Sequence, residues 1–134
     1  MYLLDTNVIL EILLDQNHAD KVASFLDDAT PGSLYISEFS LYSLGVILLR
    51  LKRQDLFRRA MEDLLLSKVL GILRLEVQDM PEIAEASQTF GLDFDDAYQY
   101  VTAGKFGLDL LSFDRDFDRT ARGRKTLQEA MQEP

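Results

Sequence analysis

The amino-acid sequence predicts an α/β fold in which a mostly parallel sheet is covered by helices on both faces. Short apolar runs alternate along the chain with longer segments whose apolar residues recur at helical spacing. Polar residues rarely interrupt these short runs, which is typical of parallel strands buried on both faces. The 134 residues are enough for one hydrophobic core, and neither an internal repeat nor a linker divides them. We therefore expect a single domain over residues 1–134.

Four apolar runs are expected to form the strands. They span residues 2–6 (YLLDT), 34–37 (LYIS), 70–77 (LGILRLEV) and 108–113 (LDLLSF). Amphipathic segments between them predict helices over residues 8–15, 18–28, 38–52, 55–66 and 81–90, with a further helix beginning near Asp93. Local signals support these bounds, because Thr6 or Asn7 can cap the first helix, Pro81 suits a first helical turn and Gly91 suits a helix end.

Composition narrows the chemistry that the chain can perform. It contains no cysteine and only one histidine, His18, which excludes disulfides, a cysteine nucleophile and zinc sites built from thiolates or histidines. Any bound metal must therefore be held by oxygen, as magnesium, manganese and calcium are. The apolar N-terminus is interrupted by Asp5 and Glu11 and lacks a basic leader and a membrane-length span. We expect a cytoplasmic protein without a membrane partner.

The net charge of −9 also limits the partners. Proteins that grip nucleic acid through a broad electrostatic surface are usually basic, so such a footprint is not expected here. An acidic site that reaches phosphates through bound cations remains compatible with this charge.

Several carboxylates are predicted to meet at one edge of the sheet. Asp5 closes the first strand, Asp114 and Asp116 follow the fourth, and the sequence LDFDDAYQY begins a helix just before that fourth strand. Ligands of parallel α/β sheets bind beyond the carboxyl ends of the strands, which is where these groups fall. Their mutual repulsion would be costly without a cation. Two divalent cations roughly 4 Å apart could activate a water molecule against a phosphodiester.

The three aspartates of LDFDDAYQY are not equivalent. At about 100° per residue, an apolar arc of the helix is predicted to be buried, and it contains Phe94, Ala97, Tyr98, Val101 and Gly104. Asp95 shares the opposite, polar arc with Gln99 and Thr102, while Asp96 lies at the shoulder between the arcs. Asp93 precedes the helix and is the natural cap. We interpret Asp93 as a cap, Asp95 as a surface charge and Asp96 as the residue nearest the interior.

Together these motifs resemble the PIN-domain family, and within it the VapC-type toxins of toxin–antitoxin pairs. The resemblance rests on LLDTNVILEILL near the N-terminus and on LDFDDAYQYVTAGKFGLDLLSFDRDFD near the C-terminus, and it extends over essentially the whole chain. It implies a three-layer α/β/α sandwich that hydrolyses RNA with Mg²⁺ or Mn²⁺, forms a homodimer and is blocked by a small antitoxin. The residues that match the catalytic carboxylates of the family are Asp5, Asp96, Asp114 and Asp116, of which the first three match metal ligands. Ser112 and Asn7 match residues that support the site.

One position departs from the family pattern. The family usually carries a glutamate in the helix after the second strand, and this chain has Ser43 there. Glu38, at the start of the same helix, is five residues and about 7.5 Å of helical rise away. Two interpretations stay open: Glu38 replaces the missing carboxylate, or it only favours the helix N-terminus electrostatically.

Three other interpretations compete with this assignment. A receiver domain would need an acidic pair after the first strand and an aspartate after the third, and both are missing. DFDRT (116–120) matches a phosphatase motif, but only fourteen residues follow it. The serious rival is a PIN fold that binds or regulates without cleaving RNA, because a serine at position 43 is a poor cation ligand. The basic segment 119–125 is either a phosphate contact or a solvated surface.

Overall fold

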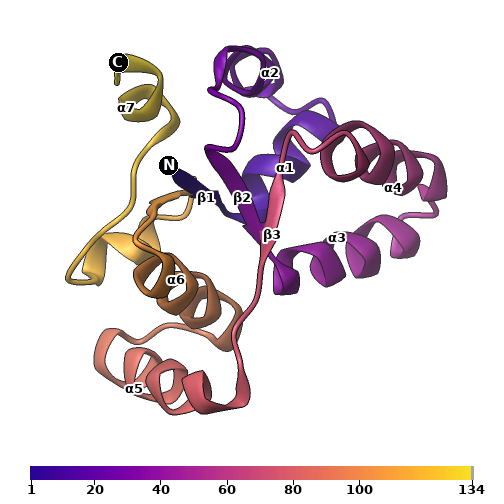
Figure 1. Cartoon of the computed structure of the whole chain (residues 1–134). Coiled ribbons are helices and arrows are strands. Elements are labelled where there is room, and N and C mark those ends of the chain that lie inside the picture. The colour runs from indigo at the N-terminus through magenta and orange to yellow at the C-terminus, as the bar shows by residue number, and fades with distance from the viewer. Residues whose placement is uncertain (134) are drawn as a thin grey trace.

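Four parallel strands form the centre of the molecule. The computed structural model describes residues 1–133 and places the strands in the order β3-β2-β1-β4, with every neighbouring pair parallel (Figure 1). The strands are β1 (Tyr2–Leu4), β2 (Leu34–Ser37), β3 (Gly71–Leu73) and β4 (Asp109–Leu111). β1 is a central strand, so the residue that follows it enters the middle of the carboxyl edge of the sheet.

Helices connect the strands and cover the sheet. They are α1 (Thr6–Leu13), α2 (Ala19–Asp28), α3 (Glu38–Arg50), α4 (Gln54–Ala60), α5 (Met80–Phe90), α6 (Phe94–Phe106) and α7 (Leu127–Gln132). A π-helical turn, η1 (Met61–Leu66), continues α4, and two short 3₁₀ turns occur at η2 (Val77–Asp79) and η3 (Arg115–Arg119). Within the described residues, no helix combines the length and the apolar character that crossing a membrane requires.

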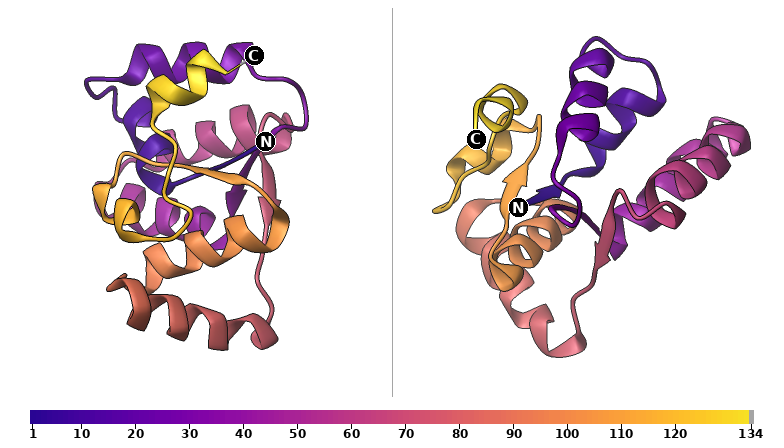
Figure 2. Two further views of the ribbon diagram at one scale, coloured as in Figure 1. Left: turned by 90° about the vertical axis from the view of Figure 1, so that its left-hand side faces the viewer. Right: turned by 45° about the horizontal axis from the view of Figure 1, so that its top comes forward.

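Two separate cores on opposite faces of the sheet confirm the predicted three-layer α/β/α sandwich. Successive residues of a strand point to opposite faces. Accordingly Leu3 and Leu110 pack with α5 and α6, whereas their neighbours Leu4 and Leu111 pack with α1, α2, α3 and α7. Figure 2 shows the two helical layers from further directions. Both faces of β1 and β4 are thus covered by helices, which explains why Leu3, Leu4, Leu110 and Leu111 are all apolar.

The predicted elements are confirmed in kind and order, with differences at their ends. The third strand covers only Gly71–Leu73 of the expected 70–77. The helix expected over 55–66 begins as α4 and changes to π-helical spacing at Met61. α7 is a helix that the sequence analysis does not predict, and it follows a capping box in which Thr126 and Glu129 bond to each other's backbone.

The predicted faces of α6 are partly wrong. Phe94, expected in the buried arc, is 53% exposed, and Gly104 is also exposed. Gln99 and Thr102, expected on the polar arc, are 2% and 0% exposed. The reason is the position of α6 between the sheet and α5 (Figure 1), so that most of its circumference is covered. Sequence periodicity describes a helix with one buried side, and α6 has two.

Candidate metal centre

Asp5 lies in the middle of the carboxyl edge of the sheet because the central strand β1 ends directly before it. Its backbone N–H continues the sheet by donating to the Leu111 carbonyl at 2.9 Å, and its side chain caps α1 by accepting from Thr6 N–H at 2.8 Å. The residue is only 6% exposed. Burial raises the pKa of the carboxyl, while the hydrogen bond from Ser112 is the largest influence in the other direction. A buried carboxylate with this many donors is held in one orientation.

Ser112, at the end of β4, joins Asp5 to the neighbouring loop. Its hydroxyl donates to Asp5 Oδ2 at 2.6 Å and accepts from Asn7 Nδ2 at 3.4 Å and from the Asp114 N–H at 2.9 Å. One donor and two acceptor positions are all that a hydroxyl offers, so Ser112 is fully used. Asn7 also accepts from the Phe113 N–H through its Oδ1. The two residues predicted to support the site therefore both lie within it.

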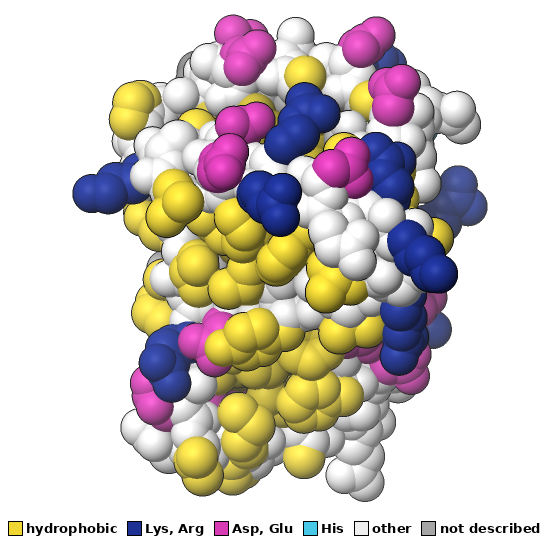
Figure 3. Space-filling view, turned by 90° about the vertical axis from the view of Figure 1, so that its right-hand side faces the viewer, with side chains coloured by type: hydrophobic (Ala, Val, Ile, Leu, Met, Phe, Trp, Pro, Cys, Tyr) yellow, Lys and Arg dark blue, Asp and Glu magenta, His cyan; other side chains and the backbone are white. Residues whose placement is uncertain are grey.

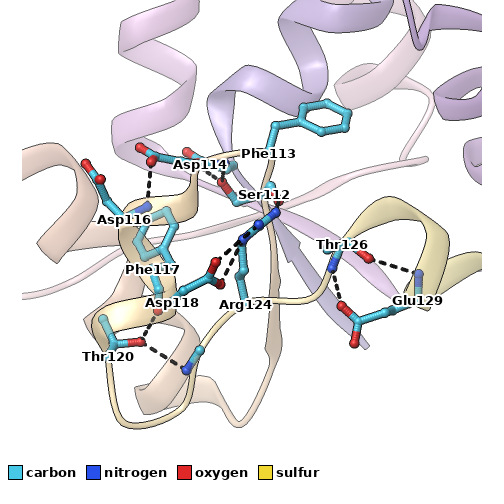
Figure 4. A network of polar contacts seen from close by, with 12 residues as sticks. Ser112, Phe113, Asp114, Asp116, Phe117, Asp118, Thr120, Arg124, Thr126 and Glu129 are labelled. Atoms are coloured by element: carbon cyan, nitrogen blue, oxygen red, sulfur yellow. Dashed lines mark hydrogen bonds and ion pairs between the residues drawn. The ribbon is translucent and has the colours of Figure 1, made fainter.

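The segment after Ser112 brings two more carboxylates to the same place. Asp114 caps η3 by accepting from the Asp116 N–H at 2.8 Å (Figure 4). In Figure 4 the side chains of Asp114 and Asp116 lie on one side of this segment, whereas Asp118 points toward Arg124. Asp118 and Arg124 form an ion pair of 3.1 Å. The third aspartate of the segment is thus neutralised away from the site.

Asp96, on the first turn of α6, completes an acidic group. Asp96, Asp114 and Asp116 each offer an oxygen, and these atoms lie within 4.8 Å of one another. Burial raises the pKa of Asp96 to about 7, with smaller contributions from the negative charges of Asp95 and Asp5. Within residues 1–133, no Lys or Arg is ion-paired with Asp5, Asp96 or Asp114. Only Asp116 has such a contact, with Arg119 at 3.7 Å.

Gln99 is a residue of this site that our sequence analysis assigned to the opposite face. Its Nε2 donates to Asp5 Oδ1 at 3.3 Å and to Ser40 Oγ at 2.6 Å. Ser40 in turn contacts the hydroxyls of Thr6, at 2.8 Å, and of Ser37, at 3.3 Å. The signal that could have located Gln99 is its spacing of three from Asp96, since residues three apart share a helix face.

These residues fit a hard divalent cation. Oxygen ligands are what Mg²⁺ and Mn²⁺ prefer. Because only Asp116 of the converging carboxylates contacts a cationic side chain in the described residues, an ion among them would reduce their mutual repulsion. Gln99 supplies a second observation, because its Oε1 is the one buried side-chain polar atom of the described residues without a hydrogen-bond partner. A buried acceptor left unpaired in this way is costly unless a water molecule or an ion satisfies it.

The remaining predicted residues lie at the margin of the site or outside it. Asp95 is exposed, and Asp93 occupies the N-cap position of α6 without a capping bond from its side chain. Glu38 lies 3.6 Å from the guanidinium of Arg74. Ser43 is half-buried on α3, one turn beyond Ser40, and its side chain makes no hydrogen bond to any described residue.

Several solved structures share this fold. VapC20 of Mycobacterium tuberculosis, described as a toxin that cleaves the sarcin-ricin loop, matches with a TM-score of 0.77 and 16% identity over 91% of this chain and 96% of its own. FitAcB of Neisseria gonorrhoeae gives 0.72 and 24% over 94% and 96%. A toxin–antitoxin complex of Klebsiella pneumoniae gives 0.73 and 20% over 95% and 98%.

Sequence comparison identifies the family directly. No curated protein sequence matches the chain significantly. The family model described as the PIN domain, however, matches residues 2–123, a stretch that begins with β1 and ends beyond η3. It therefore includes Asp5 and the three residues of the acidic group, which together are called the acidic centre below. With that match and the three-layer fold in agreement, the chain belongs to the PIN domain family.

Proposed function

We propose that this chain is a cytoplasmic, single-domain endoribonuclease that depends on Mg²⁺ or Mn²⁺ and acts as the toxin of a toxin–antitoxin pair. The observation that carries the proposal is the convergence of Asp96, Asp114 and Asp116 beside the buried Asp5. In the described residues, only Asp116 among these four is paired with a cationic side chain. The resemblance of the fold to VapC20, which is described as a toxin that cleaves the sarcin-ricin loop, supports the substrate class. RNA phosphodiesters are the proposed substrate.

In the proposed mechanism, Asp5, Asp96 and Asp114 hold the cation and Asp116 assists them. When bound, a divalent cation polarises the phosphate and lowers the pKa of a water molecule for attack. The protein contributes the positions of the ligands. Ser112 fixes Asp5 Oδ2 and Gln99 fixes Oδ1, so the carboxylate cannot rotate away. Asp96, whose pKa is about 7 before the cation binds, releases its proton so that it can serve as a ligand.

Two protein partners are part of the proposal. An antitoxin is proposed because similar folds are found in toxin–antitoxin complexes. A homodimer is proposed because one face of the molecule, which carries α3 and α4, has hydrophobic side chains gathered across its middle and lower parts (Figure 3). On α3 the exposed apolar residues Tyr42, Val46 and Leu49 form a stripe at helical spacing, and Ile72 of the edge strand β3 is exposed as well.

The test of the nuclease is cleavage of single-stranded RNA by the purified chain with Mg²⁺, with Mn²⁺ and with a chelator. We expect cleavage that requires the metal, and its loss in Asp5→Asn. Asp95→Asn is the matched control, since Asp95 is exposed and one position from Asp96, and it should retain activity. Cleavage that persists in Asp5→Asn would indicate a contaminating nuclease and would contradict the proposal.

A second candidate function is a PIN fold that binds RNA or a partner without cleaving it. It is favoured by Ser43, which offers no carboxylate, and by Glu38, which lies against Arg74. This candidate predicts that neither metal produces cleavage by wild type, while RNA or antitoxin binding is retained in Asp5→Asn.

A further inference from the structure

A groove beside the acidic centre has the opposite electrical character. It has a volume of about 620 Å³ and is lined by Lys21, Arg115, Arg124, His18 and Phe113, among others. No carboxylate belongs to its lining. Four other hollows on the described surface each contain at least one Asp or Glu. Two carboxylates pair with lining residues from outside the groove, Glu11 with His18 and Asp118 with Arg124, both at 3.1 Å. In a chain with a net charge of −9, a groove whose own lining carries no carboxylate is still a distinct local environment.

The segment that follows β4, residues 112–116, separates this groove from the acidic centre. It is called the strand end below. Phe113 and Arg115 line the groove, whereas Asp114 and Asp116, which alternate with them in the sequence, belong to the acidic group. In Figure 4 the Phe113 ring points away from the side on which Asp114 and Asp116 lie. Consecutive residues are about 3.8 Å apart along the backbone, so a strand of polymer crossing this segment meets both environments.

The cations of the groove are of two kinds. Arg124 is held rigidly, because its guanidinium is ion-paired with Asp118 and donates to the Ser112 carbonyl at 3.0 Å. Lys21 and Arg115 are exposed, and neither forms an ion pair with any carboxylate in residues 1–133. Unpaired cations beside a fixed one are suited to binding phosphates, which are bound by Lys and Arg through charge-assisted hydrogen bonds.

An aromatic pair adds a surface for stacking. The rings of His18 and Phe113 have centroids 5.5 Å apart and planes inclined at 35°. His18 remains largely exposed, and Phe113 is half-buried. Aromatic rings alongside cations are the combination by which proteins bind single-stranded nucleic acid without reading its sequence.

We propose that this groove binds the single-stranded RNA segment that flanks the cleaved phosphodiester, with Lys21 and Arg115 on phosphates and the Phe113–His18 pair under a base. The inference deepens the proposed nuclease function and rests on it for the identity of the substrate. It gives an acidic protein a local means of holding a polyanion, while the carboxylates on the other side of the same strand end hold the cation. Substrate affinity and catalysis are thereby assigned to different residues.

Binding can be measured apart from cleavage. The probe is a fluorescently labelled single-stranded RNA of about twelve nucleotides, within the usual size range of single-strand sites. Asp5→Asn protein without added metal is titrated by fluorescence anisotropy at several salt concentrations. The test variant adds Lys21→Gln and Arg115→Gln, and the control variant adds Arg50→Gln and Arg58→Gln, which remove the same charge from α3 and α4. Circular dichroism and thermal unfolding establish that all three proteins fold.

We expect the test variant to bind at least about tenfold more weakly than the control variant, as the loss of one charged hydrogen bond would cause. The dependence of log affinity on log salt should fall by roughly 1.4, because each contact to a single-strand phosphate contributes about 0.7. Equal affinities and slopes in the two variants would overturn the proposal. A second contrary result is a polyglutamate peptide that binds as tightly as the RNA and loses its binding in the test variant. That result would overturn the proposal in favour of an acidic protein ligand.

The aromatic part is tested with 2-aminopurine in the RNA, whose fluorescence is quenched by stacking. Phe113→Leu should weaken binding at least about fivefold and abolish the quenching, while Phe113→Tyr restores both.

The nuclease proposal and the groove proposal fail on different results. If RNA binds through the groove but wild type never cleaves it, the enzyme is rejected and the groove is kept. If wild type cleaves RNA but the test and control variants bind it equally, only the groove is rejected.

Discussion

Gln99 Nε2 donates a hydrogen bond to Oδ1 of Asp5, at 3.3 Å, across the boundary between α6 and the sheet. The same nitrogen donates to Ser40 on α3 at 2.6 Å. Both amide hydrogens are thus committed, and Oε1 is the atom left without a partner. Gln99 therefore links the buried carboxylate to α3, the helix on which this chain carries Ser43.

Replacing Gln99 with Leu should separate metal binding from folding. The variant removes the donor to Asp5, so we expect Mn²⁺ affinity to fall about tenfold. Removing the unpaired buried oxygen offsets the cost of taking a donor from Asp5 and Ser40, so the melting temperature of the metal-free protein should change little. Calorimetric titration and thermal unfolding measure the two effects. Thr102→Val is the matched control, since it removes another buried polar group of α6, a hydroxyl that donates to the Tyr98 carbonyl and not to the site. A lower melting temperature with unchanged Mn²⁺ affinity would make Gln99 a purely structural residue.

The raised pKa of Asp96 predicts how stability depends on pH without metal. Because the folded-state pKa is about 7 and the ordinary value is 3.8, the folded protein binds more protons than the unfolded chain between these values. The stabilising contribution of the protonated carboxyl is therefore complete below pH 3.8 and is lost as the pH rises to about 7. We expect the melting temperature to decrease across this window and the decrease to be smaller in Asp96→Asn.

Asp5, whose pKa is also raised, should retain part of this dependence in the Asp96 variant. Added Mg²⁺ should restore stability above pH 7, since an ion that binds only the folded protein stabilises it. Asp95→Asn serves as the control. A pH profile in Asp96→Asn identical to that of wild type would contradict this account.

A carboxylate introduced at Ser43 should strengthen cation binding. Ser43 lies three residues beyond Ser40, which reaches Gln99, so the two share a face of α3. We expect Ser43→Glu to increase Mn²⁺ affinity several-fold and to lower the melting temperature without metal, because it adds a negative charge to an acidic site. Glu38→Gln should leave both quantities unchanged, since Glu38 lies against Arg74. If Glu38→Gln instead abolished metal binding, Glu38 would be the replacement ligand.

The apolar stripe on α3 predicts a dimer in solution. Light scattering after size-exclusion chromatography should give twice the chain mass of 15.3 kDa for wild type and a monomer for Val46→Lys. Val46 is 50% exposed at the centre of the stripe, so a charge there would be buried by association. Met131→Lys, on α7, is the control at a site of similar exposure and should remain dimeric. A monomeric wild type would reject the dimer.

The sequence by itself was sufficient to determine the α/β class, the order of the elements as far as β4 and the position of Asp5. These depend on local properties, namely uninterrupted apolar strands, helical spacing and the rule that a carboxylate after a parallel strand faces the carboxyl edge. It also led to Ser112 and Asn7, through the resemblance of their motifs to a family. Each of these inferences requires only neighbouring residues and a regular element.

The tertiary structure decided which elements surround α6. It also decided that the segment after β4 has acidic residues on one side and a basic groove on the other. Periodicity assigned Gln99 to solvent, because one chain segment cannot indicate that both the sheet and α5 will cover a helix. The pairing of Gln99 with Asp5 spans 94 positions, and that of Arg124 with Asp118 leaves Lys21 and Arg115 as the unpaired cations of the groove. Such pairings depend on how elements pack, which is a property of the whole fold.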